Sequence, residues 1–305
     1  MIEIKSVTKK YGDFTAIDDI NIKVENCSVT GVAGYNGAGK TTLLRVIAGI
    51  FKPENGHVYL DGAESFDNDV ERKRLFYLPD EMWFPTGATV EGAAKYYAGY
   101  YPEFDMNVFS KVCEIFGLDK KKRIRSLSKG MTRQAGIAIA FGAKPKYLLI
   151  DETFDGLDPQ KKFLLRKLML EFIAETDASV IITSHDLGEI SGVCDHIVLI
   201  NGKHVQLNCA IENVSENFRR VNAVFDKTPD VSDFDTINRK NLKISGKNAF
   251  MLIYGDIEKE LEKIKNLGAN SIEAENLTLE EVFNAELDIK DNDKISSVFS
   301  KDGEN

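Results

Sequence analysis

Short apolar runs, often rich in β-branched residues, recur along the first ~210 residues and are typical of strands. They lie at 2–7, 20–24, 28–34, 57–62, 74–79, 147–151, 180–184 and 196–202. Between several of them the apolar residues follow helical spacing, at 41–50, at 159–176 and from Leu187 onward. Strands that alternate with helices predict an α/β fold built on a mainly parallel sheet.

Two regions depart from this pattern. The stretch 83–144 has mostly helical spacing, so we expect a helical subdomain that interrupts the sheet. We expect its aromatic residues to form the subdomain core; they are Tyr96, Tyr97, Tyr100 and Tyr101. After residue 210, further apolar runs and an amphipathic segment at 257–268 predict a small α/β domain. The expected organisation is a domain at 1–210, an accessory domain at 211–288 and a flexible tail at 289–305.

The composition is that of a globular chain, with 43% hydrophobic and 29% charged residues among 305. The formal charge of −9 argues against a dedicated nucleic-acid-binding protein, because such proteins gather Lys and Arg against phosphates. No apolar run approaches the ~18–20 residues of a membrane-spanning helix, and the first residues show no apolar signal segment. We therefore expect a cytosolic chain that reaches a membrane only through a partner. The four cysteines form no CxxC pair, which favours reduced, mostly buried thiols.

The segment GYNGAGKTT, at 34–42, carries the clearest chemical signal. It matches G-x-x-x-x-G-K-[ST] and lies between an expected strand and an expected helix, which is the context that a phosphate-binding loop requires. Its glycines allow successive backbone N–H groups to converge on an anion, and the helix N-terminus adds a positive dipole. Lys40 supplies a positive charge for the β- and γ-phosphates, and the hydroxyl of Thr41 can bind Mg²⁺. The motif predicts a nucleoside triphosphate site.

A second candidate group is the pair of carboxylates that ends the apolar run YLLIDE. Asp151 lies at the C-terminal end of the expected strand, where a magnesium ligand belongs. Because side chains alternate along a strand, we expect Glu152 to point to the other side, free to act as general base on an attacking water. Acidic strand ends are common, so the pair gains its meaning from the phosphate loop.

At LSKGMTRQ, residues 127–134, the chain resembles the signature motif of the ATP-binding cassette (ABC) ATPases. Other motifs of that family follow in the family's order. They are Tyr11 at the adenine-stacking position, LPDE (78–81) at the glutamine-loop position, GLDP (156–159) at the D-loop and His185 at the switch histidine. The resemblance covers about residues 1–210.

The resemblance implies an ABC-type P-loop ATPase, with ATP and Mg²⁺ as cofactors, in which two subunits enclose two ATP molecules head to tail. Ser128 and Gly130 would open a helix that serves the ATP held by the other subunit. The implied catalytic residues are Glu152, His185 and Lys40. The implied nucleotide-binding residues are Tyr11, Gly34, Asn36, Gly37, Ala38, Gly39, Lys40, Thr41, Thr42, Ser128, Gly130 and Asp158. The implied metal ligands are Thr41, Asp151 and Asp80.

Within the family the chain is most similar to bacterial drug and peptide-antibiotic exporters, because LTLEEVF at 277–283 resembles the end of their C-terminal extension. That resemblance implies a separate transmembrane permease as partner, and a homodimer or a heterodimer with a related subunit. It also implies a cytoplasmic protein, peripheral on the inner face of the cell membrane. We expect Trp83 and Phe84, just after the glutamine-loop position, to dock a permease helix. We expect no nucleic-acid partner.

One departure from the family pattern concerns the glutamine loop, where Asp80 replaces the usual glutamine and adds negative charge near the expected magnesium site. It leaves open a regulatory or immunity cassette protein that binds ATP with little turnover. A soluble, non-transport ABC ATPase acting on ribosomes or DNA is a second alternative, although such proteins usually carry two cassettes and this chain has one phosphate loop. The transported substrate does not follow from this chain, because in the family the permease carries the translocation path.

Overall fold

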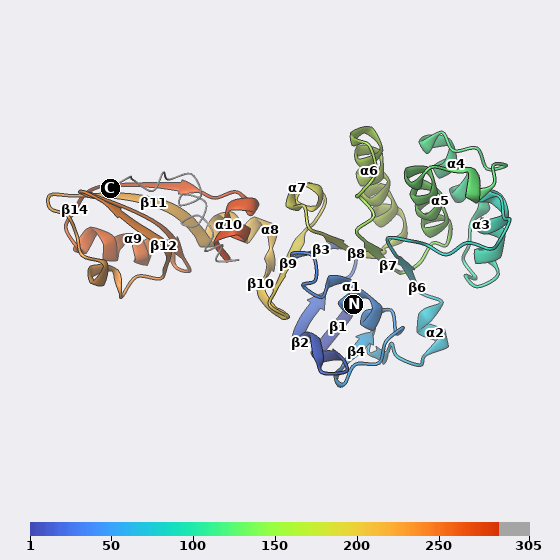
Figure 1. Cartoon of the computed structure of the whole chain (residues 1–305), viewed down its shortest axis with the longest axis horizontal. Coiled ribbons are helices and arrows are strands. Elements are labelled where there is room, and N and C mark those ends of the chain that lie inside the picture. Colours follow the sequence, from blue (N-terminus) through green and yellow to red (C-terminus); the bar gives the residue numbers. More distant parts are fainter. Residues whose placement is uncertain (287–305) are drawn as a thin grey trace, which may run out of the picture. The chain divides into compact units, whose positions relative to one another are not determined.

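The computed structural model describes residues 1–286 of the chain (Figure 1). Backbone contacts divide the chain into two compact units, Met1–Asn208 and Cys209–Asn305. The tail expected at 289–305 lies outside the described residues. None of the helices within 1–286 is both long and apolar enough to cross a membrane.

A six-stranded sheet, in the order β10-β9-β3-β8-β7-β6, forms the centre of the first unit. Its strands are β3 (Val29–Ala33), β6 (Leu75–Leu78), β7 (Tyr147–Asp151), β8 (Ser179–Ser184), β9 (His196–Asn201) and β10 (His204–Ala210). Strand β3 pairs in parallel with β8 and β9, and β7 pairs in parallel with β6 and β8. The predicted α/β fold with a mainly parallel sheet is confirmed. Every residue of β3, β7 and β8 is buried, which explains why these strands read as continuous apolar runs.

The first strands of the chain form a separate antiparallel sheet in the order β2-β1-β4-β5, which the sequence pattern did not distinguish from the parallel one. Its strands are β1 (Ile2–Tyr11), β2 (Phe14–Val24), β4 (Asn55–Leu60) and β5 (Ala63–Glu64). Strands β1 and β2 are joined only by Gly12 and Asp13, and Gly12 has a φ of 58°. A two-residue connection with a positive φ can join only antiparallel neighbours, because a parallel pair needs a long crossover.

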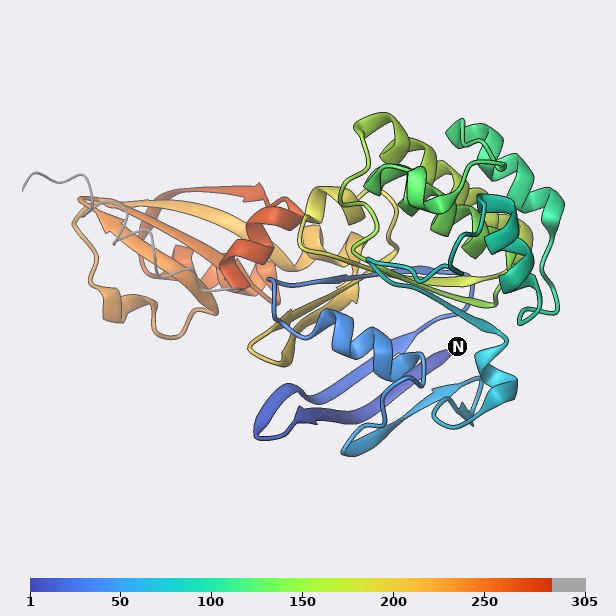
Figure 2. The same cartoon turned by 45° about the vertical axis from the view of Figure 1, so that its right-hand side comes forward.

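Helix α1 (Lys40–Ile47) lies between the two sheets (Figure 2). Its apolar residues Leu43, Leu44 and Ile47 are fully buried in one core with residues of both sheets. On the other side of the parallel sheet lie α6 (Pro159–Thr176) and α7 (Leu187–Ile190) (Figure 1). The start of α1, which carries the phosphate loop, is therefore held by packed layers on two sides.

The crossover from β6 to β7 contains the expected helical subdomain. Its elements are α3 (Val90–Ala98), α4 (Met106–Phe116), a 3₁₀ turn (Ile124–Ser126) and α5 (Lys129–Gly142). A short helix, α2 (Asp69–Arg72), precedes β6. Helix α5 contacts both α4 and β6, so the signature segment at its start is anchored to the edge of the parallel sheet.

The aromatic residues of α3 and the turn after it face two ways. Tyr97 and Tyr101 are partly buried and lie with their ring centroids 6.0 and 5.0 Å from that of Phe76 in β6. Tyr96 and Tyr100 are exposed. The expectation of an aromatic core is therefore right for one pair and wrong for the other, because residues three or four positions apart share a helix face and their neighbours do not.

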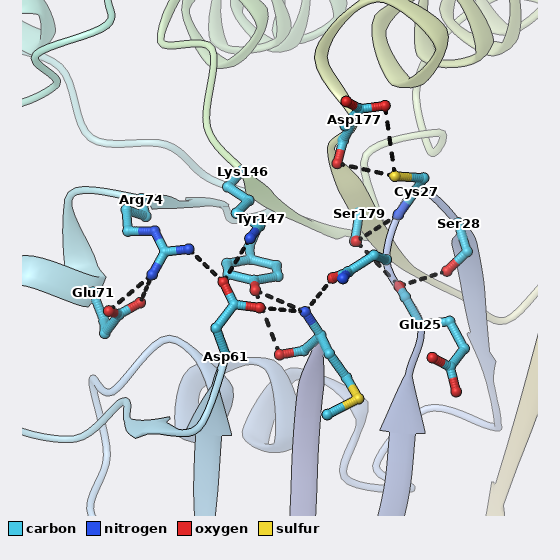
Figure 3. A network of polar contacts seen from close by, with 12 residues as sticks. Glu25, Cys27, Ser28, Asp61, Glu71, Arg74, Lys146, Tyr147, Asp177 and Ser179 are labelled. Atoms are coloured by element: carbon cyan, nitrogen blue, oxygen red, sulfur yellow. Dashed lines mark hydrogen bonds and ion pairs between the residues drawn. The ribbon is translucent and has the colours of Figure 1, made fainter.

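A polar network joins the two sheets of the first unit (Figure 3). Asp61, just after β4, forms ion pairs with Arg74 ahead of β6 and with Lys146 ahead of β7. Its other carboxylate oxygen lies 2.7 Å from the amino group of Met1. Burial alone would raise the pKa of Asp61, but hydrogen bonds from Lys146, the Met1 amino group, Tyr147 and Arg74 lower it well below its usual range.

The second unit is a small α/β fold, as expected. Its antiparallel sheet has the order β12-β13-β11-β14, with β11 (Phe218–Phe225), β12 (Arg239–Ser245), β13 (Asn248–Tyr254) and β14 (Ala269–Asn276). Its helical elements are α8 (Ile211–Asn217), a 3₁₀ turn (Val231–Phe234), α9 (Ile257–Asn266) and α10 (Leu279–Glu286). Ile264 of α9 is fully buried in one core with inward-facing strand residues such as Val221, Ala249 and Ile253.

Candidate active site

The phosphate loop joins β3 to α1, and its glycines take backbone conformations that other residues avoid. Gly37 has a φ of 83°, and Gly39, which caps α1, has a φ of 103°. A Cβ atom on Gly39 would lie 2.4 Å from Cγ2 of Ile17 and 2.7 Å from the carbonyl oxygen of Ala16. Only glycine fits there, because the left-handed backbone and the close approach of β2 both exclude a side chain. The loop leads directly into the N-terminus of α1, whose first N–H groups have no acceptor within the helix.

The side chain of Lys40, at the first position of α1, is 3% exposed. Its Nζ atom donates to the carbonyl oxygens of Gly34 at 2.7 Å and Tyr35 at 3.2 Å, so the loop curls around the ammonium group. The same Nζ lies 3.2 Å from Oε1 of Glu152. A buried cation with a carboxylate partner is thus held at the mouth of the loop, where a phosphate would meet it.

An open cavity of about 340 Å³ lies beside the loop. Its lining consists of Tyr11, Phe14, Ala16, Asn36, Gly37, Gly39, Lys40, Thr41, Thr42 and Glu152. The cavity therefore gathers half of the residues that the sequence analysis named for the site. Gly34 and Ala38 support the loop instead: a Cβ on Gly34 would lie 2.6 Å from the carbonyl oxygen of Ile200, and Ala38 packs against the core.

Two exposed aromatic rings stand at one edge of this cavity. Tyr11 ends β1 and Phe14 begins β2, and the hairpin register places them directly opposite each other. Tyr11 is 44% exposed and contacts Phe51 edge to face, with ring centroids 5.8 Å apart. Sequence reasoning found Tyr11 and missed Phe14; the signal for Phe14 was its position across the two-residue turn from Tyr11.

Asp151, at the end of β7, is 2% exposed, and polar groups surround its carboxylate. Oδ1 accepts hydrogen bonds from the hydroxyls of Thr41 at 3.1 Å and Thr183 at 2.8 Å, and Oδ2 accepts one from Tyr77 at 2.9 Å. Burial and the charge of Asp151 raise the pKa of Tyr77, so the phenol stays protonated and remains a donor. Thr183 and Tyr77 lie on strands that flank β7, and the sequence motifs did not reveal either of them.

Glu152 departs from the strand geometry that the sequence suggested. Its φ is 47°, a left-handed conformation that is costly for a residue with a side chain, and its N–H lies 3.1 Å from the hydroxyl of Thr183. The strand alternation therefore breaks at this residue. Instead of separating on two sides of the strand, the carboxylates of Asp151 and Glu152 contact the neighbouring α1 residues Thr41 and Lys40.

His185 follows β8 and lies on the Glu152 side of the site. Its Nδ1 atom is 3.7 Å from Oδ2 of Asp155, and its side chain is 43% exposed. Within residues 1–286, Glu152, Asp155 and His185 each offer one polar atom, and these atoms lie within 4.8 Å of one another. The structure thus brings His185 beside the candidate general base, as the motif order indicated.

Comparison with known proteins fits this geometry. The model of the family described as ABC transporter matches residues 17–155. The bacitracin transport ATP-binding protein BcrA of Bacillus licheniformis is 32% identical over 204 residues, which cover 66% of this chain and 67% of BcrA. A probable sulfate/thiosulfate import ATP-binding protein CysA of Chlorella vulgaris is 30% identical over 230 residues, covering 69% of this chain and 92% of CysA. The chain belongs to the ABC transporter ATP-binding proteins.

A solved structure shows the same fold. The dimeric structure of MJ0796, a bacterial ABC transporter cassette, matches with a TM-score of 0.63 at 20% identity, over 69% of this chain and 98% of that chain. The family match and the relatives, together with this fold, make the chain an ATP-binding subunit of a transporter and an ATPase. The phosphate loop, Asp151 and Glu152 lie together in this chain, through the contacts of Thr41 with Asp151 and of Lys40 with Glu152.

The start of α5, with Ser128 and Gly130, is called the signature turn here, and it lies apart from that cavity. Ser128 is exposed and caps α5, since its hydroxyl accepts a hydrogen bond from the N–H of Met131 at 3.2 Å. A Cβ on Gly130 would lie 3.0 Å from the carbonyl oxygen of Gly156, so this glycine lets α5 approach the loop after β7 closely. Among the described residues, neither Ser128 nor Gly130 lines the cavity around Lys40.

Asp158 of the ABC subunit has a role within its own chain. Its carboxylate caps α6 by accepting a hydrogen bond from the N–H of Lys161 at 2.9 Å, and Pro159 occupies the first position of that helix. The residue does not line the Lys40 cavity either. The local structure therefore explains Asp158 as a helix cap.

Asp80 is the predicted metal ligand that the structure does not bring to the Thr41–Asp151 pair. Its carboxylate forms an ion pair with Arg133 of α5. It lines a second cavity, of about 330 Å³, whose lining includes neither Thr41 nor Asp151. The structure thus pairs Asp80 with a buried arginine, whereas the role of Asp80 as a metal ligand stays a prediction.

Proposed function

We propose that two ABC subunits of this kind, or one of them and a related subunit, enclose two ATP molecules head to tail. Each site would join the phosphate loop of one subunit to the signature turn of the other. The observation that carries this proposal is the separation within one chain: Ser128 and Gly130 lie at the start of α5, outside the cavity that holds Lys40 and Glu152. No acidic residue occupies the first turn of α5, which leaves its N-terminus suited to an anion.

Within such a site, the residues of the first unit have distinct roles. Lys40 and the N–H groups at the start of α1 bind the β- and γ-phosphates, and the ring of Tyr11 stacks on adenine with Phe14 beside it. Glu152 accepts a proton from the attacking water, and His185, at the same side, contacts the γ-phosphate. The cavity and the contacts of Lys40 and Glu152 support the roles of the phosphate loop and Glu152, and the family resemblance supports those of Tyr11 and His185.

The residues also suit Mg²⁺, a hard cation that prefers oxygen ligands. The hydroxyl of Thr41 and the carboxylate of Asp151 are 3.1 Å apart at the base of the loop. These two side chains would hold the ion. When bound, Mg²⁺ neutralises charge on the phosphate oxygens. Tyr77 and Thr183 fix the orientation of the Asp151 carboxylate for this task.

The partner in this proposal is a separate transmembrane permease, and the subunit works on the cytoplasmic face of the membrane. The relatives are named as transport proteins, BcrA for bacitracin transport and CysA for sulfate/thiosulfate import. We favour export because of the C-terminal LTLEEVF. In the structure that segment opens α10, where Thr278 and Glu281 cap the helix reciprocally through contacts of 2.9 and 3.3 Å.

An exposed aromatic patch supplies the docking surface for the permease. Trp83 is 60% exposed, and its ring centroid lies 5.4 Å from that of Tyr96, which in turn lies 5.2 Å from that of Tyr100. These rings line a groove of about 570 Å³. Aromatic residues with polar edges are enriched at protein interfaces. Phe84, the other residue expected here, is only partly exposed.

The composite site is tested by the mass of the protein in solution. Light scattering of wild type and Glu152→Gln, each with and without ATP and Mg²⁺, measures whether ATP drives association. We expect the mass of Glu152→Gln to double with ATP and Mg²⁺, because the variant binds ATP without the carboxylate needed for hydrolysis. A variant that binds ATP and stays monomeric would contradict the homodimer and direct the search to a related subunit.

The docking surface is tested by co-purification with membrane-embedded subunits after detergent extraction. Trp83→Ala combined with Tyr100→Ala should remove the permease from the purified complex and leave ATP binding unchanged. Phe163→Ala is the matched control, because Phe163 is 54% exposed on α6, outside the groove. Equal recovery of the permease with all three proteins would refute the assignment.

A further inference from the structure

Arg133 carries a buried guanidinium in the helical subdomain, and some of its nitrogen atoms lack hydrogen-bond partners. Its side chain is 7% exposed, and among the described residues its Nε and Nη1 atoms have no hydrogen-bond partner. Nη2 is paired with the carboxylate of Asp80. Buried charges in proteins are normally paired, so the carboxylate of Asp80 offsets the cost of burying this arginine.

The position of Arg133 links three segments of the site. It belongs to α5, one helical turn after Ser128 and Gly130. Its partner Asp80 lies in the loop after β6. On the opposite side, a Cβ on Gly156 would lie 3.1 Å from Nη1 of Arg133, so the guanidinium lies against the loop that follows Glu152.

Charge at this point is consistent with such a link. Burial lowers the pKa of Arg133, and the charges of Asp155 and Glu152 act in the other direction. With Asp80, three carboxylates therefore act on one guanidinium. A glutamine at position 80 would remove the one ion pair that Arg133 forms among the described residues, and would leave only the charges of Asp155 and Glu152 acting on it.

We propose that Asp80 and Arg133 form a charge pair that fixes the start of α5 against the loops after β6 and β7, and that Asp80 is therefore not a magnesium ligand. Arg133 is a positioning residue: it sets where Ser128 and Gly130 stand relative to Glu152 without touching nucleotide. The acidic residue at position 80 then balances the buried charge of the arginine at position 133. This inference rests on the proposed composite site, because the position of the signature turn affects the reaction only there.

A double-mutant cycle on the full chain, without nucleotide, tests the pair itself. The variants are Asp80→Asn, Arg133→Met and the two combined. Asp80→Asn should lower the melting temperature by roughly 5 °C, since it strands a buried charge, and the double variant should recover most of that loss. Glu81→Gln is the control, because Glu81 lines the same cavity and no ion pair involves it in the described residues. Additive losses would overturn the pair.

A binding titration tests the statement about magnesium. Fluorescent ATP analogue at fixed concentration is titrated with Mg²⁺ for wild type, Asp80→Asn and Glu81→Gln. We expect the midpoints to agree within about twofold, because the Lys40 cavity and the Thr41–Asp151 pair are unchanged. A rise of about tenfold or more with Asp80→Asn alone would make Asp80 a magnesium ligand and overturn the inference.

Steady-state hydrolysis separates positioning from a purely structural role. The double variant should melt near the wild-type temperature and keep the KM for ATP, yet show a kcat reduced about tenfold, since the signature turn is no longer held in register. A double variant with wild-type melting and wild-type kcat would show that the pair serves only stability. The melting cycle needs no turnover, so a failure of the proposed composite site would leave its result intact.

Discussion

The two parts of the proposed site are built in opposite ways. Around Lys40 and Asp151 the side chains are 2–3% exposed and their polar atoms are matched within the chain. At Ser128 and Gly130 the helix N-terminus is open, and a serine hydroxyl is the cap. The residues around Lys40 and Asp151 can bind nucleotide within one chain. The start of α5 can act on nucleotide only when another subunit lies against it. We therefore expect some mutations to weaken ATP binding and others to weaken dimerisation alone.

The largest effect should come from the buried cation. Lys40→Ala removes the charge that the phosphates meet, and charge-assisted hydrogen bonds of this kind are worth about 1.5–3 kcal/mol, so ATP affinity should fall roughly 10- to 150-fold. Isothermal titration calorimetry measures it, with Lys23→Ala on β2 as control, because Lys23 pairs only with exposed Glu25. Unaltered ATP affinity in Lys40→Ala would refute the assignment of the Lys40 cavity as the nucleotide site.

A change at the signature turn should spare ATP binding and impair association. Ser128→Arg places a bulky cation at the open end of α5 and removes its cap, so ATP-driven dimerisation and hydrolysis should fall about tenfold or more while the affinity of the single chain for ATP stays within about twofold. Sedimentation and calorimetry on the same sample measure the two quantities. Weakened ATP binding in a monomeric sample would show that the signature turn belongs to the same-chain site.

Mixing these two variants sharpens the comparison further. In a head-to-tail dimer of Lys40→Ala with Ser128→Arg, one site carries both changes and the other carries neither. Equal mixing gives about half mixed dimers, so about a quarter of the wild-type rate should return if the sites act independently. No recovery on mixing would mean that hydrolysis does not depend on residues from two chains.

The smallest effect concerns the network that holds the nucleotide half together. Asp61→Asn keeps the shape of the side chain but removes the charge that Arg74 and Lys146 share, and should lower the free energy of unfolding by about 1–2 kcal/mol near pH 7. Because the folded chain depresses the pKa of Asp61, this contribution is present above about pH 4 and fades as the pH falls through the lower, folded-state pKa. Denaturant unfolding of both proteins at several pH values measures it; a pH-independent difference would exclude the charge as the cause.

The sequence predicted the parts of the site that are local along the chain. The phosphate loop, its strand and its helix follow from one continuous motif, and α6 has the bounds that its spacing indicated. Side chains brought in by strand neighbours could not be predicted, because Tyr77 and Thr183 carry no motif and reach Asp151 only through the sheet order. The separate antiparallel sheet escaped prediction for the same reason.

Two side-chain contacts in the structure differ from what the sequence suggested. Period-two alternation failed at Glu152, because a left-handed residue directly after β7 turns the carboxylate toward Lys40. The ion pair of Asp80 could not be predicted from the sequence, because its partner, Arg133, lies 53 positions later in the chain (133 minus 80) and on another element. Sequence patterns relate residues that are close along the chain, whereas ion pairs can form between residues that are distant in sequence.

The contacts of Lys40 have one more consequence. The carbonyl oxygens of Gly34 and Tyr35 accept hydrogen bonds from its ammonium group, and the carboxylate of Glu152 forms an ion pair with it at 3.2 Å. The Glu152 side chain is 25% exposed, so water also reaches this partner of the ammonium. In the proposed site, a phosphate bound by Lys40 would compete with Glu152 for the same cation. Binding of ATP would then free the carboxylate proposed as general base, so nucleotide binding would come before activation of the attacking water.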